Sequence, residues 1–313
     1  MSRKIGMYVK VKTAVGFREL FTSQSNIFSG FQRSFEEADY VVIGVPFDVT
    51  STYRTGARFG PNAIREASLN IETYSFRSKM DIEDLRMHDA GDLHVSADTS
   101  ETIERIAKVA NEVLEKGKIP VFIGGEHTIT FGAVKGLGPK ISKTAIISFD
   151  AHLDLRDEFM GLKLSHTTFM RRINEQLRPA KIVEVGTRAV CREELDYAEE
   201  AKIYYLPAHK IRKEGINYAI KCLKEEILDA ESIYLSIDMD VLDPAFAPAV
   251  QNPESDGLET FTLLEVLGNL CDKRVIGFDV VEVAPIYDQG VTAIHAAKII
   301  FEVLCNLEQH KFG

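Results

Sequence analysis

The sequence predicts an α/β protein in which a mostly parallel central sheet of about eight strands lies between two layers of helices. Short apolar runs alternate along the chain with segments whose apolar residues recur at helical spacing. Several of these runs are apolar on both faces, as strands buried in a parallel sheet are. The chain has 313 residues and is 45% apolar, so it is long enough to bury the core that such a sheet requires.

The strands and helices are expected in strict alternation. We expect strands at residues 40–46, a short one closed by 88–92, then 119–123, 144–149, 181–186, 203–206, 232–237 and 275–281. Helices are expected at residues 63–72, 100–115, from about 128, 165–177, 192–201, 213–229, 262–271 and 292–307. Pro61 suits the first turn of the first helix. A long proline-rich loop, 243–257, follows one strand and is of the kind that lines a site.

The chain shows no linker, low-complexity tract or internal repeat, so residues 39–313 are expected to form a single domain. Residues 1–38 have little periodicity and are interpreted as an irregular N-terminal arm that lies on the body or on a neighbouring subunit. The net charge of −10 argues against a nucleic-acid partner. Neither a signal peptide nor a membrane-spanning run is expected, and the four widely spaced cysteines suit a reducing compartment, so we predict a cytoplasmic protein.

Metal-ligating residue types follow three of the predicted strands. Asp150, His152 and Asp154 occupy alternate positions after one apolar run, so their side chains point the same way. Asp238 and Asp240 follow a second run, and His127 follows a third through the turn Gly124-Gly125. Because ligands bind at the carboxyl ends of strands in open parallel sheets, these groups are expected to meet.

Two imidazoles and four carboxylates exceed what one ion needs and suit two divalent ions about 3.5–4 Å apart. The absence of a thiolate argues against a structural zinc site. Mixed nitrogen and oxygen ligands fit Mn²⁺, while Zn²⁺, Fe²⁺ and Co²⁺ stay open because the general affinity order favours later metals.

These motifs resemble the ureohydrolases, the family of arginase, agmatinase and formimidoylglutamase. The resemblance covers about residues 40–305. It is carried by residues 44–48 and 54–65, Gly124-Gly-Glu-His-Thr128, Asp150-Ala-His-Leu-Asp154, Ser165-His-Thr-Thr168, Ser236-Ile-Asp-Met-Asp-Val-Leu-Asp-Pro244 and Glu282-Val-Ala-Pro285. The family implies an arginase-like fold, two Mn²⁺ ions per subunit and assembly into homo-trimers or hexamers.

The resemblance also implies a role for each site residue. One Mn²⁺ would be held by His127, Asp150, Asp154 and Asp238, and the other by Asp150, His152, Asp238 and Asp240, with Asp150 and Asp238 bridging. Asp154 would also accept a hydrogen bond from the bridging hydroxide that attacks the guanidinium carbon. Glu282 would hold the guanidinium group, and His166 would shuttle protons to the leaving amine.

The loop after Asp154 resembles that of prokaryotic agmatinases, and it lacks the Asn- and Ser-rich run with which arginases hold an α-carboxylate. We therefore expect hydrolysis of agmatine to putrescine and urea, a step of polyamine biosynthesis. Asp157 and Glu158 are candidates for the distal ammonium. Ser255 and Asp256 replace a glycine-rich turn at a place where the loop is expected to border the cleft.

Several alternatives stay open. Arginine, aminopropylagmatine, guanidinobutyrate and formimidoylglutamate are other substrates of the same chemistry, and a metal-dependent amidase or deacetylase of similar fold is a more distant alternative. Glu126 is interpreted as structural, and Asp243 as part of the Asp-Pro turn. The five remaining histidines are interpreted as surface or packing residues: His88, His94, His209, His295 and His310.

Overall fold

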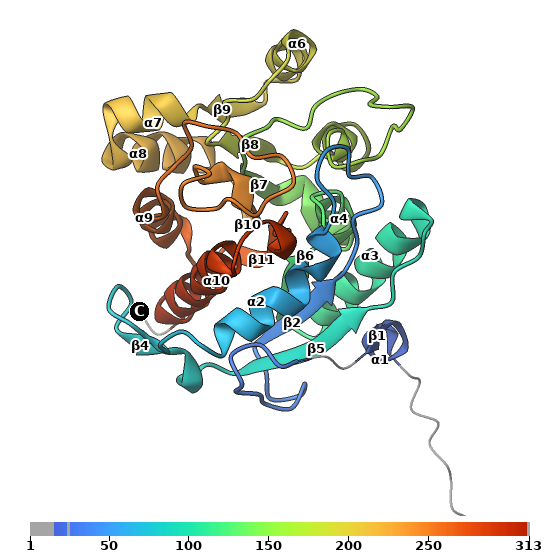
Figure 1. Cartoon of the computed structure of the whole chain (residues 1–313), viewed down its shortest axis with the longest axis vertical. Helices are drawn as coiled ribbons and strands as arrows, with labels where there is room; N and C mark the ends of the chain where they lie inside the picture. The colour runs from blue at the N-terminus through green and yellow to red at the C-terminus, as the bar shows by residue number, and fades with distance from the viewer. Residues whose placement is uncertain (1–15, 24–25, 312–313) are drawn as a thin grey trace, which may run out of the picture.

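The structure is a computed structural model that describes residues 16–23 and 26–311. Its centre is a sheet in which eight parallel strands run side by side, as the sequence predicts (Figure 1). From one edge to the other these strands are β5 (Met87–Leu93), β2 (Tyr40–Val45), β6 (Ile119–Gly124), β11 (Val275–Val281), β10 (Ser232–Asp238), β7 (Thr144–Phe149), β8 (Lys181–Val185) and β9 (Tyr204–Leu206).

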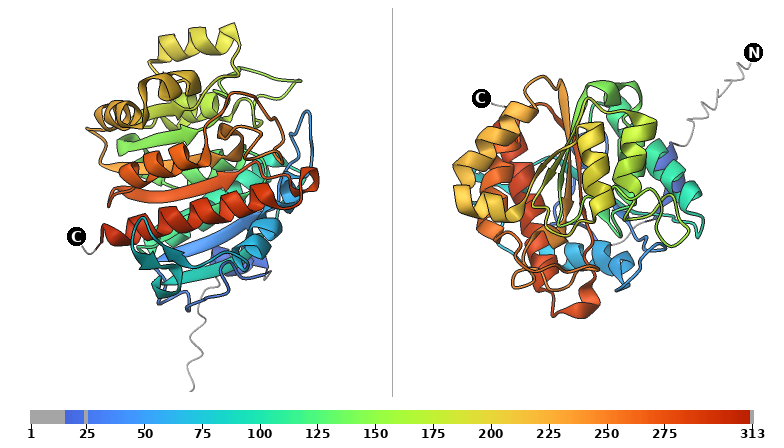
Figure 2. Two further views of the ribbon diagram at one scale, coloured as in Figure 1. Left: turned by 60° about the vertical axis from the view of Figure 1, so that its left-hand side comes forward. Right: turned by 90° about the horizontal axis from the view of Figure 1, so that it is seen from above.

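Helices cover both faces of the sheet, which Figure 2 shows nearly edge-on between them. The helices of one face are α2 (Gly60–Ser68), α7 (Ala208–Glu214), α8 (Ile216–Glu226), α9 (Thr260–Leu270) and α10 (Val291–Gln309). Those of the other face are α3 (Thr99–Glu115), α4 (Ile129–Lys135), α5 (Phe169–Arg172) and α6 (Arg192–Ala201). β2 and β7 are buried along their whole length because apolar side chains pack above and below them. The three-layer fold is therefore confirmed.

The described part of the N-terminal arm is more regular than predicted. Residues 17–21 form the short helix α1 (Phe17–Phe21), and β1 (Thr22–Ser23) adds an antiparallel ninth strand beside β5. Phe28 is buried and lies edge-on against Phe301 of α10. Residues 17–23 are thus more regular than expected, whereas residues 26–38 contain no helix or strand, and Phe28 lies on the body. Residues 1–15 lie outside the described part of the chain, and a contact with a neighbouring subunit stays a prediction.

Three predicted helices have different limits. The helix expected at residues 213–229 is two helices, since Gly215 interrupts it with a φ of +91° that favours glycine. The helix expected at 165–177 starts only at Phe169 and continues as a π-helical turn, Ile173–Leu177. Before it, the Thr168 hydroxyl bonds the backbone at Lys163 and Ser165, which competes with helix formation. The first helix ends at Ser68 rather than residue 72.

The remaining regular elements are short. β3 (Tyr74–Ser75) and β4 (Met80–Asp81) form a separate antiparallel pair. The 3₁₀ turns are Ala57–Phe59, Ile82–Asp84, Gly138–Lys143, Met239–Val241 and Pro285–Tyr287. Within the described residues, no helix is both long enough and apolar enough to cross a bilayer. The four central strands β6, β11, β10 and β7 end side by side, and the candidate site lies at their carboxyl ends.

Candidate metal centre

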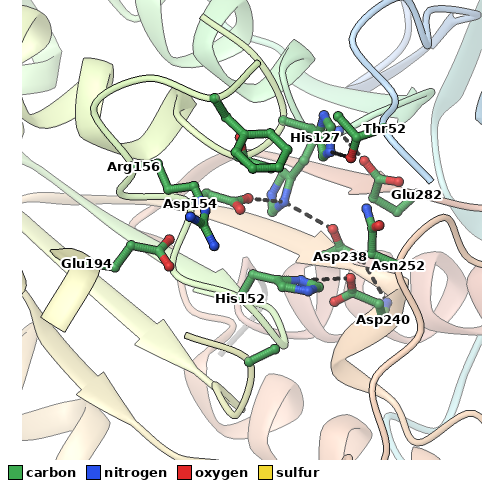
Figure 3. Close-up of a pocket in the computed structure, with 14 residues that line it drawn as sticks. Thr52, His127, His152, Asp154, Arg156, Glu194, Asp238, Asp240, Asn252 and Glu282 are labelled. Carbon is green, nitrogen blue, oxygen red and sulfur yellow. Dashed lines mark hydrogen bonds and ion pairs between the residues drawn. The ribbon is translucent and has the colours of Figure 1, made fainter. Parts of the chain in front are cut away.

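The six predicted ligands come together at the carboxyl ends of these strands, and Figure 3 shows five of them, all except Asp150. We call them the strand-end cluster: His127, Asp150, His152, Asp154, Asp238 and Asp240. His127 follows β6 through a tight turn that passes against the preceding loop. A side chain at Gly125 would lie 1.8 Å from the backbone oxygen of Phe47, so only glycine fits there. Glu282 follows β11 directly and joins the same pocket.

Asp150 stands between the two imidazoles. Its Oδ2 lies 3.0 Å from Nδ1 of His127, and its Oδ1 lies 3.3 Å from Nδ1 of His152. Nδ1 of His127 is also 3.1 Å from Asp238 and 3.4 Å from Asp154. Nδ1 of His152 is 3.1 Å from Asp240. The ligand atoms therefore form two groups that share Asp150, one with His127 and Asp238 and one with His152 and Asp240.

The charges in this pocket fit divalent cations. The four carboxylates of the cluster are buried, and none of them is paired with a lysine or arginine among the described residues. Burial, together with the neighbouring carboxylates, raises the pKa of Asp238 well above its usual value. Burial and the charge of Asp150 raise the pKa of Asp154 to about 7. Cations at this position would compensate the crowded negative charge.

His127 presents a free ligand atom to the carboxylates. Its Nε2 lies 2.9 Å from the hydroxyl of Ser236, whose proton goes to Asp279 at 2.7 Å. Nε2 therefore carries a proton, which leaves Nδ1 as the ring atom that a cation could bind. Nδ1 is buried and has no hydrogen-bond partner. The sequence analysis missed Ser236 and Asp279, although polar residues inside otherwise apolar strands were a signal.

Glu282 has one carboxylate oxygen engaged and one free. Its Oε1 accepts a hydrogen bond from the backbone N–H of His127 at 2.7 Å, and its buried Oε2 has no partner. Burial, then the charge of Asp238, raises the pKa of Glu282 well above its usual value. Glu282 and Asp154 also have left-handed backbones, with φ of 69° and 52°. Such strain costs on the order of 1 kcal/mol per residue and often marks a functional position.

His166 contacts two threonines of the loop after β2. Its Nδ1 lies 3.1 Å from the hydroxyl of Thr50, and its Nε2 lies 3.3 Å from that of Thr52. Burial, then the nearby His152 and His127, lowers the pKa of His166 to about 4. The imidazole is thus neutral near pH 7 and lines the same pocket as the strand-end cluster.

Loops and the first turn of α6 supply the outer part of the pocket. We call these residues the loop wall: Thr52, Arg156, His166, Glu194 and Asn252. Sequence reasoning identified only His166 among them. Glu194 is buried, and its oxygens accept the backbone N–H groups of Leu155 at 3.2 Å and Cys191 at 3.0 Å. The proline-rich loop does line the site, as expected, through Asn252.

Two expectations about the outer pocket are wrong. Asp157 and Glu158 do not line it, because Asp157 turns away to bond Arg172 at 2.7 Å. Ser255 and Asp256 border a different surface hollow, and Asp256 pairs with Arg212 of α7.

Asp243 has the turn role that the sequence predicts. Its carboxylate accepts the backbone N–H groups of Ala245 and Gly257, each at 3.0 Å. It thereby closes the two ends of the proline-rich loop.

Comparisons with known proteins agree with this geometry. A family model described as the arginase family matches residues 38–305. The agmatinase of Bacillus subtilis is 37% identical over 284 residues, covering 89% of this chain and 95% of that protein. The N(1)-aminopropylagmatine ureohydrolase of Thermococcus kodakarensis is 37% identical over 270 residues, covering 85% and 90%. The solved agmatine ureohydrolase of Thermoplasma volcanium is 37% identical with a TM-score of 0.83, covering 90% and 93%.

Proposed function

This chain belongs to the arginase family, and on that premise we propose that it hydrolyses agmatine to putrescine and urea with two Mn²⁺ ions. The family membership makes it a ureohydrolase that acts on guanidino substrates, as the sequence motifs predict. The observation that carries the proposal is Asp150, whose two oxygens face two different imidazoles at 3.0 and 3.3 Å. A carboxylate in this position suits a bridge between two ions.

The six residues of the strand-end cluster would hold the ions, with His127 and His152 on opposite sides of Asp150. Two divalent ions there would supply Lewis acidity and bring the pKa of water close to neutrality. We assign Mn²⁺ because the ligands are two nitrogens and several carboxylate oxygens without a thiolate.

The protein's own residues would bind the substrate and move its protons. The free Oε2 of Glu282 would accept N–H groups of the planar guanidinium and hold its carbon over the cluster. Asp154 would orient the attacking water through its carboxylate. When the C–N bond to the alkyl chain breaks, water supplies the oxygen of urea, and the leaving amine takes up a proton carried by His166.

Agmatine is the preferred substrate in this proposal because several of the relatives are named agmatinases and because the loop wall carries Glu194. The carboxylate of Glu194 forms no ion pair within the described residues, so it would receive the distal ammonium. Arg156 also belongs to the loop wall, and its positive charge would repel a second cationic group on the substrate. The relative from Thermococcus kodakarensis supports aminopropylagmatine, a longer guanidino amine, as the second candidate.

Urea release over a panel of guanidino substrates tests the substrate assignment. Agmatine should exceed arginine, guanidinobutyrate and formimidoylglutamate by at least about tenfold in kcat/KM, or ~1.4 kcal/mol in barrier. Equal or faster turnover of arginine contradicts the assignment, and faster turnover of aminopropylagmatine replaces it with the second candidate.

Metal content tests the cofactor separately. Chelation should abolish activity, and Mn²⁺ should restore it with two ions bound per chain. One tightly held Zn²⁺ would favour a deacetylase-like amidase instead.

We also propose that the enzyme works in the cytoplasm as a homo-trimer or hexamer, and that residues 39–313 form one domain. Light scattering measures the assembly directly. A variant lacking residues 1–15 tests the proposed intersubunit role of the arm without removing Phe28, which is buried against the body. An unchanged assembly size in that variant would show that residues 1–15 are not needed for the interface.

A further inference from the structure

A buried carboxylate of unassigned role lies beside the strand-end cluster. Glu126 precedes His127, is fully buried and is surrounded by hydrogen-bond donors. Its Oε1 accepts from the hydroxyls of Thr50 at 2.6 Å and Thr128 at 2.7 Å. Its Oε2 accepts from the backbone N–H of Thr50 at 2.8 Å and from Ser51 at 3.4 Å. Glu126 thus ties down the loop whose threonines contact His166.

Counting protons at Thr50 determines which nitrogen of His166 carries hydrogen. A threonine hydroxyl has one proton, and the shortest contact gives that proton to Glu126. The oxygen of Thr50 must therefore accept from its other neighbours. These are the backbone N–H of His166 at 3.1 Å and the ring Nδ1 of His166 at 3.1 Å. Nδ1 accordingly carries the proton, and Nε2 keeps a lone pair.

The count is the same whether Glu126 is ionised or carries a proton on Oε2, and the two short O–H···O contacts at Oε1 favour Oε2 as the atom that a proton would occupy. If Oε2 held a proton, the hydroxyl of Ser51 would be the neighbour that accepts it, while Oε1 would still accept from Thr50 and Thr128. The hydroxyl of Thr128, 3.3 Å from that of Thr50, has already given its proton to Glu126. In both cases the hydroxyl of Thr50 offers only an acceptor to the imidazole.

We propose that Glu126 is a positioning residue that acts through Thr50 to hold His166 as the Nδ1–H tautomer, with Nε2 as the one nitrogen that exchanges protons with the pocket. The inference rests on the proposed role of His166 as proton carrier. Nε2 lies beside Thr52, which lines the pocket. The other tautomer would set a bare Nδ1 against an oxygen that has no proton left to give.

Solid-state ¹⁵N NMR of the Zn²⁺-loaded full-length protein, labelled at its eight histidines, reads this tautomer directly at pH 7.5. The variant His166→Asn identifies the His166 signals by their loss. We expect Nδ1–H in the wild type. In Glu126→Gln the new amide N–H group donates to the hydroxyl oxygen of Thr50. The hydroxyl of Thr50 then donates its own proton to Nδ1 of His166, so we expect the Nε2–H tautomer in this variant.

Matched variants separate the relay from general loss of packing. Thr50→Val removes the hydroxyl and should leave a mixture of tautomers, whereas Thr50→Ser keeps the hydroxyl and should restore Nδ1–H. Thr128→Val deletes an equally short bond to Glu126 but no contact with His166, so the tautomer should not change. An Nε2–H tautomer in the wild type, or an unchanged tautomer in both Glu126→Gln and Thr50→Val, overturns the proposal.

Kinetics give a second readout with agmatine and Mn²⁺. Because general acid–base catalysis contributes about 10²–10⁴-fold, we expect Glu126→Gln and Thr50→Val to lower kcat by at least about tenfold at unchanged KM and metal content. Thr50→Ser should recover most of the lost kcat. A higher KM at unchanged kcat would contradict the proposed action of Glu126 through Thr50 on His166. A wild type that releases no urea from any guanidino compound overturns the proposed function instead, and the NMR measurement still decides the tautomer.

Discussion

The strand-end cluster and the loop wall face the same pocket but are built differently. Every residue of the cluster lies within a few positions of the carboxyl end of a central strand, and its neighbours are fixed by the parallel register. The loop wall comes from three loops and from the first turn of α6, and its residues are held by hydrogen bonds to backbone groups or hydroxyls. The sheet thus positions the proposed metal ligands, while the loops and the start of α6 position the groups that we propose select and protonate the substrate.

The two regions also differ in electrostatics. Burial raises the pKa of the acids Asp154, Asp238 and Glu282, so a nearby cation would be needed to stabilise their ionised forms. Burial lowers the pKa of His166, so its neutral form is the stable one. Substitutions in the cluster should therefore remove metal, and substitutions in the wall should leave metal bound and alter selectivity or proton transfer.

The largest effect is expected from Asp150→Asn. Loss of the shared carboxylate should release at least one ion per chain and lower kcat/KM for agmatine by at least about 10³-fold, or ~4 kcal/mol. Metal analysis of the purified protein, together with a urea assay, measures both. Asp157→Asn is the matched control because that acid lies outside the pocket lining and pairs with Arg172. If Asp150→Asn keeps two ions and hydrolyses agmatine at a near-normal rate, the metal site must lie elsewhere.

The next effect concerns acid stability of the metal-free protein. The pKa of His166 falls from 6.5 in the unfolded chain to about 4 in the folded protein. Between pH 6.5 and pH 4, His166 is therefore protonated in the unfolded chain and neutral in the folded protein. Stability is therefore lost as pH falls through that window, by up to about 3 kcal/mol. Urea denaturation at pH 7 and pH 4 should show that His166→Asn loses about that much less than the wild type. Equal losses in both proteins would mean that His166 is protonated in the folded state.

Much of the fold was predictable because one local pattern determines it. Doubly apolar runs such as the one before Asp150 identify strands buried on both faces, and several of the eight predicted parallel strands were found this way, although β5 is not such a run. The ends of helices were less predictable, because they depend on the backbone conformation of single residues, such as the positive φ of Gly215. The antiparallel strand β1 was missed, since two residues carry no period and its anchors are tertiary contacts.

The candidate site divides in the same way. Ligand-type residues at alternate positions after a strand point in one direction, so the convergence of the cluster followed from the sequence. Glu194 was missed because its place in the pocket depends on how the first turn of α6 meets the loop after β7, about forty positions away in the chain. The same loop packing turns Asp157 outward.

Ser236→Ala tests the support beneath the cluster. Without the hydroxyl, Nε2 of His127 loses the acceptor that fixes its tautomer, and Asp279 loses one donor. Loss of such a partner typically costs 10–100-fold in metal affinity or activity. Titration with Mn²⁺ should show weaker binding of one ion, with KM for agmatine unchanged once metal is saturating. Ser236→Thr keeps a hydroxyl and is the control, and equal affinity in wild type and Ser236→Ala would make the contact incidental.

The smallest effect is expected at Glu194, and it needs a matched pair of substrates. Glu194→Gln places an amide N–H group against a backbone N–H of Leu155 or Cys191, so it weakens the loop as well as removing charge. Agmatine carries a distal ammonium that n-butylguanidine lacks. A general loosening of the loop should lower kcat/KM equally for both compounds. A hydrogen bond to a charged group contributes about 1.5–3 kcal/mol, so the wild type should prefer agmatine by at least about tenfold in kcat/KM. If Glu194→Gln keeps that preference, the ammonium is recognised by another group. If the preference disappears while Mn²⁺ stays bound, selectivity resides in the loop wall alone.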